Sequence, residues 1–264
     1  MTPRFAITAA VLGLASPATA QTLAARVAQT PDGDARVTYT ARPGVYGNGR
    51  NVIEWGCDHG HCRQQSDDNW SDDADWRSPC DSGPVRLALR VQGGRVVSLR
   101  VYVGGQWVPR AGVTDLGRVA APEAGRFLLG LARQDGSDVG DHAVFAATLA
   151  DSVTTWPELL RIARDELVPE QTRRSAVFWV SQAAEDAATR GLDSLVSEDT
   201  VDREVREQAV FALSQRPREE GVPALIRIAR THGDPEIRRK AIFWLGQSHD
   251  PRALALFEDL LTKQ

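Results

Sequence analysis

The chain repeats one short phrase four times, as Ala143-Val144-Phe145-Ala146, Ala176-Val177-Phe178-Trp179, Ala209-Val210-Phe211-Ala212 and Ala241-Ile242-Phe243-Trp244. The copies follow one another at offsets of 33, 33 and 32 residues. A fixed period of this length is typical of a stacked repeat, in which each unit buries its apolar face only against its neighbours. The sequence therefore predicts an elongated repeat structure, which suits binding better than catalysis.

The residues around the four phrases follow a helical period. Asp234-Pro235 and Asp250-Pro251 mark two helix starts, because aspartate is a good N-cap and proline is tolerated at the first helical position. We expect helices at 122–133, 138–149, 155–166, 169–184, 187–196, 201–214, 219–231, 234–246 and 250–262. The first is expected to cap the stack, and the other eight to form four consecutive pairs.

The first half of the chain has a different period. From Pro84 to Val91 apolar and polar residues alternate, and the alternation resumes from Arg95 to Val103 after the turn residues Gly93 and Gly94. Period two indicates half-buried strands, and glycine suits the turn of a hairpin. Further strands are expected at 35–42, 51–56 and 113–119. The predicted fold class is α+β by segments, with a small β domain at 21–119 followed by an α-solenoid at 120–264.

An acidic stretch from Asp58 to Asp81 interrupts these strands. It has few aliphatic residues to build a core, so we expect a long loop there. The segment Asp67 to Asp73 has the oxygen ligands of a calcium loop, but it lacks the glycine at the sixth position and the closing glutamate. A solvated acidic loop is the better interpretation.

Three of the four units place an arginine three residues before the alanine of the phrase, at Arg173, Arg206 and Arg238. In two units an acidic residue precedes it, as in 202–206 and 234–238. This pattern resembles the HEAT repeat, in its short bacterial form, over about residues 138–263. The resemblance implies a scaffold that binds a protein or peptide. A minority of such proteins handle cofactors or metals, so a cofactor- or metal-handling enzyme subunit is the alternative.

Two sets of side chains are candidates for partner contact. If the second helix of each pair lines the inner face, as the resemblance implies, four arginines could bind carboxylates there in a bidentate manner. Two tryptophans in the repeated phrase could contact a ligand or simply pack. The candidates are Arg161, Arg164, Arg227, Arg230, Trp179 and Trp244. The phenylalanines of the phrase, including Phe211, are expected to be core residues.

Cys57, His59 and Cys62 lie close together, with Cys80 downstream. In an exported chain a disulfide among the three cysteines is the first interpretation. A pair that includes Cys80 closes the longer loop and so restricts the unfolded chain more. Zinc bound by Cys57, His59, Cys62 and Cys80 is one alternative, because thiolates and imidazoles are its usual ligands. Unpaired thiols are the other.

The N-terminus has the pattern of an export signal over 1–20. Arg4 precedes an apolar run from Phe5 to Leu14, and Ala18-Thr19-Ala20 forms a small-x-small cleavage site. Ten apolar residues are too few to span a bilayer, which takes about 20. The sequence therefore predicts an exported, periplasmic or secreted protein without a membrane span.

Charge and motifs complete the functional prediction. Residues 121–264 hold 18 lysine and arginine residues against 24 aspartate and glutamate residues, so this half is acidic, whereas phosphate binding requires positive charge. The sequence shows no serine-hydrolase, zinc-protease or phosphate-loop motif. We therefore expect a non-enzymatic scaffold that binds a protein or peptide, with no cofactor and no nucleic acid.

Export is directly testable. N-terminal sequencing of the protein purified from its native host should begin at Gln21, because a signal peptidase cuts after the small-x-small site. An intact Met1 would contradict the signal peptide, and with it the oxidising compartment on which the disulfide interpretation rests.

Overall fold

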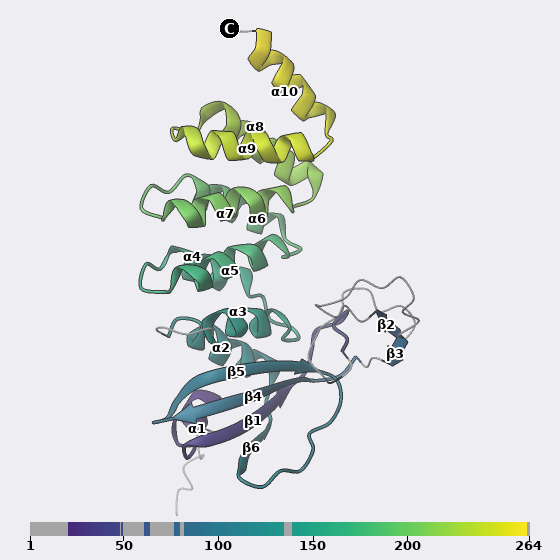
Figure 1. Ribbon diagram of the computed structural model, residues 1–264, viewed down its shortest axis with the longest axis vertical. Helices are drawn as coiled ribbons and strands as arrows, with labels where there is room; N and C mark the ends of the chain where they lie inside the picture. The colour runs from purple at the N-terminus through teal and green to yellow at the C-terminus, as the bar shows by residue number, and fades with distance from the viewer. Residues whose placement is uncertain are drawn as a thin grey trace, which may run out of the picture.

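The computed structural model describes residues 21–47, 49, 61–63, 77–79, 82–134 and 139–262, of which 61–63 and 77–79 are described as backbone only. A small sheet forms one end of an elongated molecule, and layers of helices continue from it to the C-terminus at the far end (Figure 1). The α+β fold class predicted from the sequence is confirmed. The export segment 1–20 and the expected strand at 51–56 lie outside the described residues.

The sheet has four strands in the order β5-β4-β1-β6. These are β1 (Gly33–Tyr39), β4 (Val85–Gln92), β5 (Arg95–Val103) and β6 (Val113–Arg118). The predicted hairpin is confirmed, because β4 pairs antiparallel with β5 and both turn glycines have positive φ. β1 pairs antiparallel with β4 and parallel with β6.

Two details of the first half differ from the expectation. A short helix, α1 (Leu23–Ala28), precedes the sheet, and Leu23 and Val27 pack into the core. The stretch expected to be one long loop contains two short strands, β2 (His61–Arg63) and β3 (Arg77–Pro79), which pair antiparallel. Three-residue strands carry too little periodic signal for sequence analysis to find them.

All nine helices expected after residue 120 are present, within a few residues of the expected bounds. They are α2 (Ala121–Leu131), α3 (Val139–Thr148), α4 (Trp156–Arg164), α5 (Glu170–Ser181), α6 (Asp186–Val196), α7 (Arg203–Ser214), α8 (Arg218–Thr231), α9 (Pro235–Gln247) and α10 (Pro251–Thr262). Within the described residues, no helix is long and apolar enough to cross a membrane.

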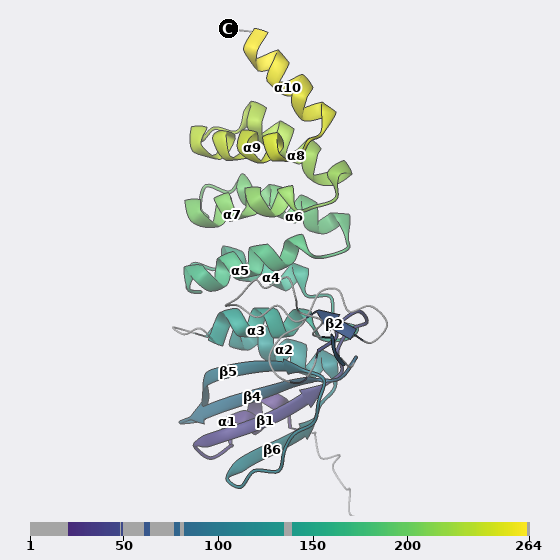
Figure 2. The ribbon, with the colours of Figure 1, turned by 45° about the vertical axis from the view of Figure 1, so that its right-hand side comes forward.

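The pairing of the helices is offset by one from the expectation. The layers are α2 with α3, α4 with α5, α6 with α7 and α8 with α9, and α10 follows the last layer (Figures 1 and 2). The expectation that the first helix caps the stack was therefore wrong, because α2 is a full partner of α3 and the sheet lies at that end. The repeated phrase consequently lies on the second helix of each layer.

The repeated phenylalanines are not core residues, which corrects a second expectation. The alanine of each phrase is fully buried, and so are Val144, Val177 and Val210. Phe145 and Phe211 are only partly buried, and Phe243 is 55 % exposed. Successive helical residues are turned by about 100°, so the residue after the buried valine points to the edge of the buried face.

The sheet closes the first layer of the solenoid. The Tyr39 side chain is fully buried, and its hydroxyl donates a hydrogen bond of 2.6 Å to the Ala146 carbonyl of α3. The chain beyond β1 then pairs with the end of α3, where Arg42 donates to Thr148 and Leu149 and Ala41 bridges Ala150. One continuous hydrophobic core therefore runs from α1 to α10.

Buried arginines tie successive layers together. Arg173 of α5 pairs with Asp202, the residue before α7, and Arg206 of α7 lies 4.0 Å from Asp234, the residue before α9. Arg216 is buried between the α5–α6 and α7–α8 connections and donates to Thr189, Glu220 and three backbone carbonyls. Arg173, Arg206 and Arg216 therefore link successive layers, whereas Arg238 donates to the His232 and Gly233 carbonyls of the connection before its own helix.

The corrected core makes a comparison of two neighbouring positions informative. Leu213→Ala should cost about 2–5 kcal/mol of unfolding free energy, because the Leu213 side chain is fully buried. Phe211→Ala should cost about 1–2 kcal/mol, since its ring is only partly buried. Denaturant unfolding of both variants measures the order. A larger loss of unfolding free energy for Phe211→Ala than for Leu213→Ala would show that the Phe211 ring is a core residue after all.

Candidate functional site

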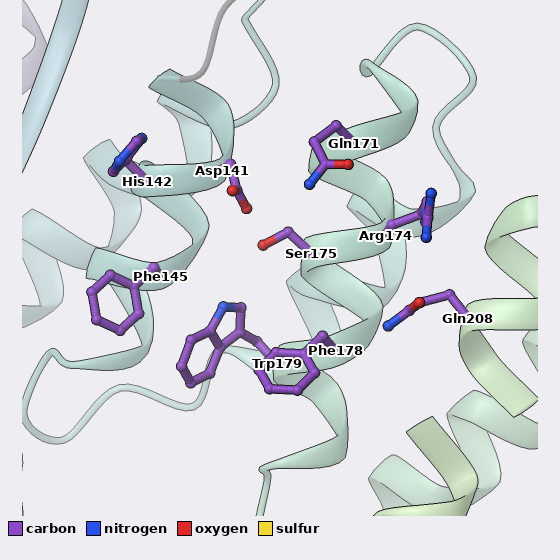
Figure 3. Close-up of a pocket in the computed structure, with 9 residues that line it drawn as sticks. All are labelled: Asp141, His142, Phe145, Gln171, Arg174, Ser175, Phe178, Trp179 and Gln208. Atoms are coloured by element: carbon purple, nitrogen blue, oxygen red, sulfur yellow. The ribbon is translucent and has the colours of Figure 1, made fainter. Parts of the chain in front are cut away.

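The second helices α3, α5, α7 and α9 lie side by side and form one face of the solenoid (Figure 1). A cavity of about 410 Å³ opens on this face. It is lined by Asp141, His142, Phe145, Gln171, Arg174, Ser175, Phe178, Trp179 and Gln208 (Figure 3). Three consecutive repeats therefore contribute to one site.

The apolar part of the cavity is built around Trp179. Its ring centroid lies 5.1 Å from that of Phe145 on the preceding layer and 5.2 Å from that of Phe178 on its own helix. Figure 3 shows the indole between these two rings. We call these three residues the N-terminal cradle. All three are partly buried, so each retains ring surface that a ligand could cover.

The polar part of the cavity offers both signs of charge. Asp141 comes from α3, and Arg174 from α5 lies 3.6 Å from Glu170 of the same helix. Gln171 and Gln208 add amide groups that donate and accept hydrogen bonds. Within the described residues, no group of three or more His, Cys, Asp and Glu could hold a metal ion. The arrangement is therefore suited to recognition by apolar contact and hydrogen bonding.

The same arrangement of rings recurs two layers further on. The Trp244 centroid lies 4.9 Å from that of Phe211 and 5.0 Å from that of Phe243. We call these residues the C-terminal cradle. Trp244 also lines a second cavity of about 240 Å³, together with residues at the C-terminal ends of α7 and α9. Both candidate tryptophans therefore lie on the row of second helices and beside a cavity.

The four candidate arginines lie elsewhere. Arg161 and Arg164 belong to α4, and Arg227 and Arg230 belong to α8. In the observed layers, α4 with α5 and α8 with α9, these are the first helices, whereas the tryptophans lie on the second. The arginines and the tryptophans therefore occupy different rows, and the part of either set in partner binding stays a prediction.

Each of the four arginines already has a carboxylate partner. Arg164 binds Glu198 through two hydrogen bonds of 2.7 Å, and the others pair with carboxylates on the same helix or a neighbouring element. These pairs are Arg161 with Glu158, Arg227 with Asp193 and Arg230 with Asp259. Binding a partner's carboxylate would require breaking these pairs, so their part in partner binding stays a prediction without support from the geometry.

The cysteine cluster is not tested by the structure. Cys57, His59 and Cys80 lie outside the described residues, and Cys62 is described only as backbone in β2. The disulfide and the zinc site both stay predictions. Metal analysis of the purified protein separates them, because a zinc site requires stoichiometric metal.

The structure adds site residues that the sequence analysis did not select. Asp141, Gln171, Arg174, Ser175 and Gln208 are ordinary surface residues by composition. Their only sequence signal is position, because each lies three, four or seven residues before a repeated phenylalanine and so shares its side of the helix. Reading that signal requires knowing that the phenylalanines are at the surface.

Comparison with known proteins supports the repeat. The family of HEAT repeats matches residues 192–264, which include the C-terminal end of α6 and all of α7 to α10. Among curated proteins none matches the chain. The C-terminal region is therefore a helical repeat similar to HEAT repeats, which commonly serve as protein-interaction scaffolds.

The Arg164–Glu198 pair allows a test of the arginines' structural role. Hydrogen bonds from Arg164 hold the pKa of Glu198 below its usual value. A carboxylate with a lowered folded-state pKa contributes stability above its unfolded value of about 4.3, and that stability is lost as the pH falls through the folded pKa.

Arg164→Ala should therefore lower the unfolding free energy by up to about 1 kcal/mol at neutral pH, and by progressively less below about pH 4. Arg161→Ala is the control, because Arg161 is largely exposed and pairs within its own helix. Denaturant unfolding at neutral and acid pH measures both. An Arg164→Ala deficit that does not change with pH would contradict the assignment.

Proposed function

We propose that this protein is an exported, non-enzymatic scaffold that binds a protein or peptide on the row formed by α3, α5, α7 and α9. The observation that carries the proposal is the partly buried ring cluster of Phe145, Phe178 and Trp179, which lines a cavity together with charged and amide side chains. Aromatic residues with exposed ring surface are enriched at protein interfaces, where they contribute much of the binding free energy.

The shape of the site favours a macromolecular partner. Its lining residues come from α3, α5 and α7, so the site follows the row of helices and is not enclosed by one layer. A repeat stack presents such continuous surfaces to extended ligands. The similarity of residues 192–264 to HEAT repeats points to the same class of function.

The proposal of export rests on the sequence of residues 1–20 and on nothing in the helical stack. If the chain is exported, its partner shares the periplasm or the extracellular space. The search for the partner therefore begins with proteins of those compartments.

The proposal is tested by affinity capture from periplasmic and secreted fractions of the native host. Full-length protein is compared with Trp179→Ala, which removes the centre of the N-terminal cradle, and with Arg161→Ala, which removes an exposed side chain from the other row. We expect a captured protein that the Trp179→Ala variant loses by about tenfold or more and Arg161→Ala retains. Equal capture by all three proteins, or loss with Arg161→Ala alone, would contradict the assigned face.

A further inference from the structure

The N-terminal and C-terminal cradles are two copies of one arrangement. In each, the tryptophan ring centroid lies about 5 Å from that of a phenylalanine on the second helix of the preceding layer. It also lies about 5 Å from the ring centroid of the phenylalanine immediately before it in the sequence. The ring pair within one helix is nearly perpendicular in both, at 80° for Phe178 with Trp179 and 79° for Phe243 with Trp244. The cross-layer ring pairs differ more, at 34° for Phe145 with Trp179 and 53° for Phe211 with Trp244. Two ring clusters of the same composition and spacing therefore recur along one row.

The junction between the cradles is different. The position of the tryptophan is occupied on α7 by Ala212, whose side chain is fully buried. No indole therefore bridges α5 and α7, although Phe178 and Phe211 keep their places in the repeat. The row offers two separated apolar surfaces instead of one continuous stripe.

The charges on this row follow the same two-layer period. The position four residues before the repeated phenylalanine is Asp141 on α3, Arg174 on α5, Glu207 on α7 and Arg239 on α9. The N-terminal cradle therefore has an acidic residue on α3 and an arginine on α5, and the C-terminal cradle has an acidic residue on α7 and an arginine on α9. These arginines pair with Glu170 and Glu236 of their own helices, and Glu207 pairs with Lys240.

We propose that the partner binds as one extended segment with two apolar anchor side chains about six residues apart, one in each cradle. The spacing follows from the geometry of the stack, since packed helices lie about 10 Å apart and the cradles are two layers apart. An extended chain advances about 3.3 Å per residue, so about six residues cover about 20 Å. This inference rests on the proposed function and specifies the chemistry of its ligand.

The polar surroundings of the two cradles also match. Each cradle has an acidic residue and an arginine at the same repeat positions, and Arg174, Arg239 and Glu207 are already in ion pairs. Two similar halves of a bound segment would therefore meet the same kinds of side chain. Simultaneous occupation of both cradles makes the second contact intramolecular and raises the affinity above that of either anchor alone. A segment with a tandem, twice-repeated motif satisfies both requirements.

The test uses a phage library of random peptides about twelve residues long, which in extended form exceed the ~20 Å between the cradles. The library is selected on the immobilised full-length chain, and an enriched peptide is then synthesised. We expect enriched sequences with two large apolar residues about six positions apart. Replacing either anchor by alanine, or inserting two glycines between the anchors, should weaken binding about tenfold or more.

These peptide changes leave the protein unaltered, so misfolding cannot produce their result. Among protein variants, Trp179→Ala and Trp244→Ala should each weaken peptide binding, because each removes the contact with one anchor. Leu254→Ala is the matched control, because Leu254 is an apolar side chain of α10 that is 61 % exposed and belongs to neither cradle. It should bind the peptide as the parent does.

The outcomes separate the two proposals. Enriched peptides with a single anchor, or with anchors at no fixed spacing, would overturn the two-anchor inference and leave the proposed function standing. No enrichment over an empty surface would also overturn the two-anchor inference, whereas the proposed function is decided by the capture experiment. The remaining possible occupant of the cradles is a second copy of this chain, which sedimentation at increasing protein concentration tests. A dimer that is lost in the Trp179→Ala/Trp244→Ala variant would assign the cradles to that second copy and overturn the inference.

Discussion

A pair of short helices cannot bury its own apolar face, and every other feature of this molecule follows from that constraint. Each layer of the solenoid is covered by the next, and the sheet covers the first. The hydrogen bond from the buried Tyr39 hydroxyl to Ala146 fixes the sheet on α3. At the opposite end α10 packs on the last layer through Ala253 and Leu256 and projects beyond it (Figure 1), so Leu254 and Leu261 remain exposed there.

The links between layers are polar as well as apolar. A buried arginine is costly unless it is paired and hydrogen-bonded, and removal of its partner is correspondingly destabilising. Arg216 meets this requirement fully, with five acceptors drawn from the end of α5, the α5–α6 connection, α6 and α8. Arg173 and Arg206 instead reach the carboxylate before the next second helix. These contacts fix how one layer sits on the next, which apolar packing alone specifies less sharply.

The candidate site is a consequence of the same repeat. The alanine and valine of each phrase point into the stack, so the phenylalanine that follows is turned to its surface. Alternate copies add a tryptophan, and the charged residues one turn earlier alternate in sign. The repeat that builds the core therefore also places equivalent side chains at regular intervals along one face, and a recurring ligand motif is the natural complement to such a surface.

The sequence by itself determined the elements. The helices after residue 120 and the hairpin at 85–103 follow from local periodicity, capping residues and turn glycines, which act over a few residues. The sequence also determined that the copies stack, because repeats of this length bury their apolar faces against one another. The family match over residues 192–264 agrees with that interpretation.

Only the tertiary structure decided which helices share a layer and which side of each helix is covered. The phrase around Phe211 is equally apolar whether the Phe211 ring points into the core or along the surface. Turning the helix about its axis by one residue exchanges these two orientations. Arg164 and Trp179 both looked like groove residues, yet one is paired with Glu198 on the first row and the other lies in a ring cluster on the second. Such differences depend on contacts between residues about 30 positions apart, and local sequence patterns do not encode them.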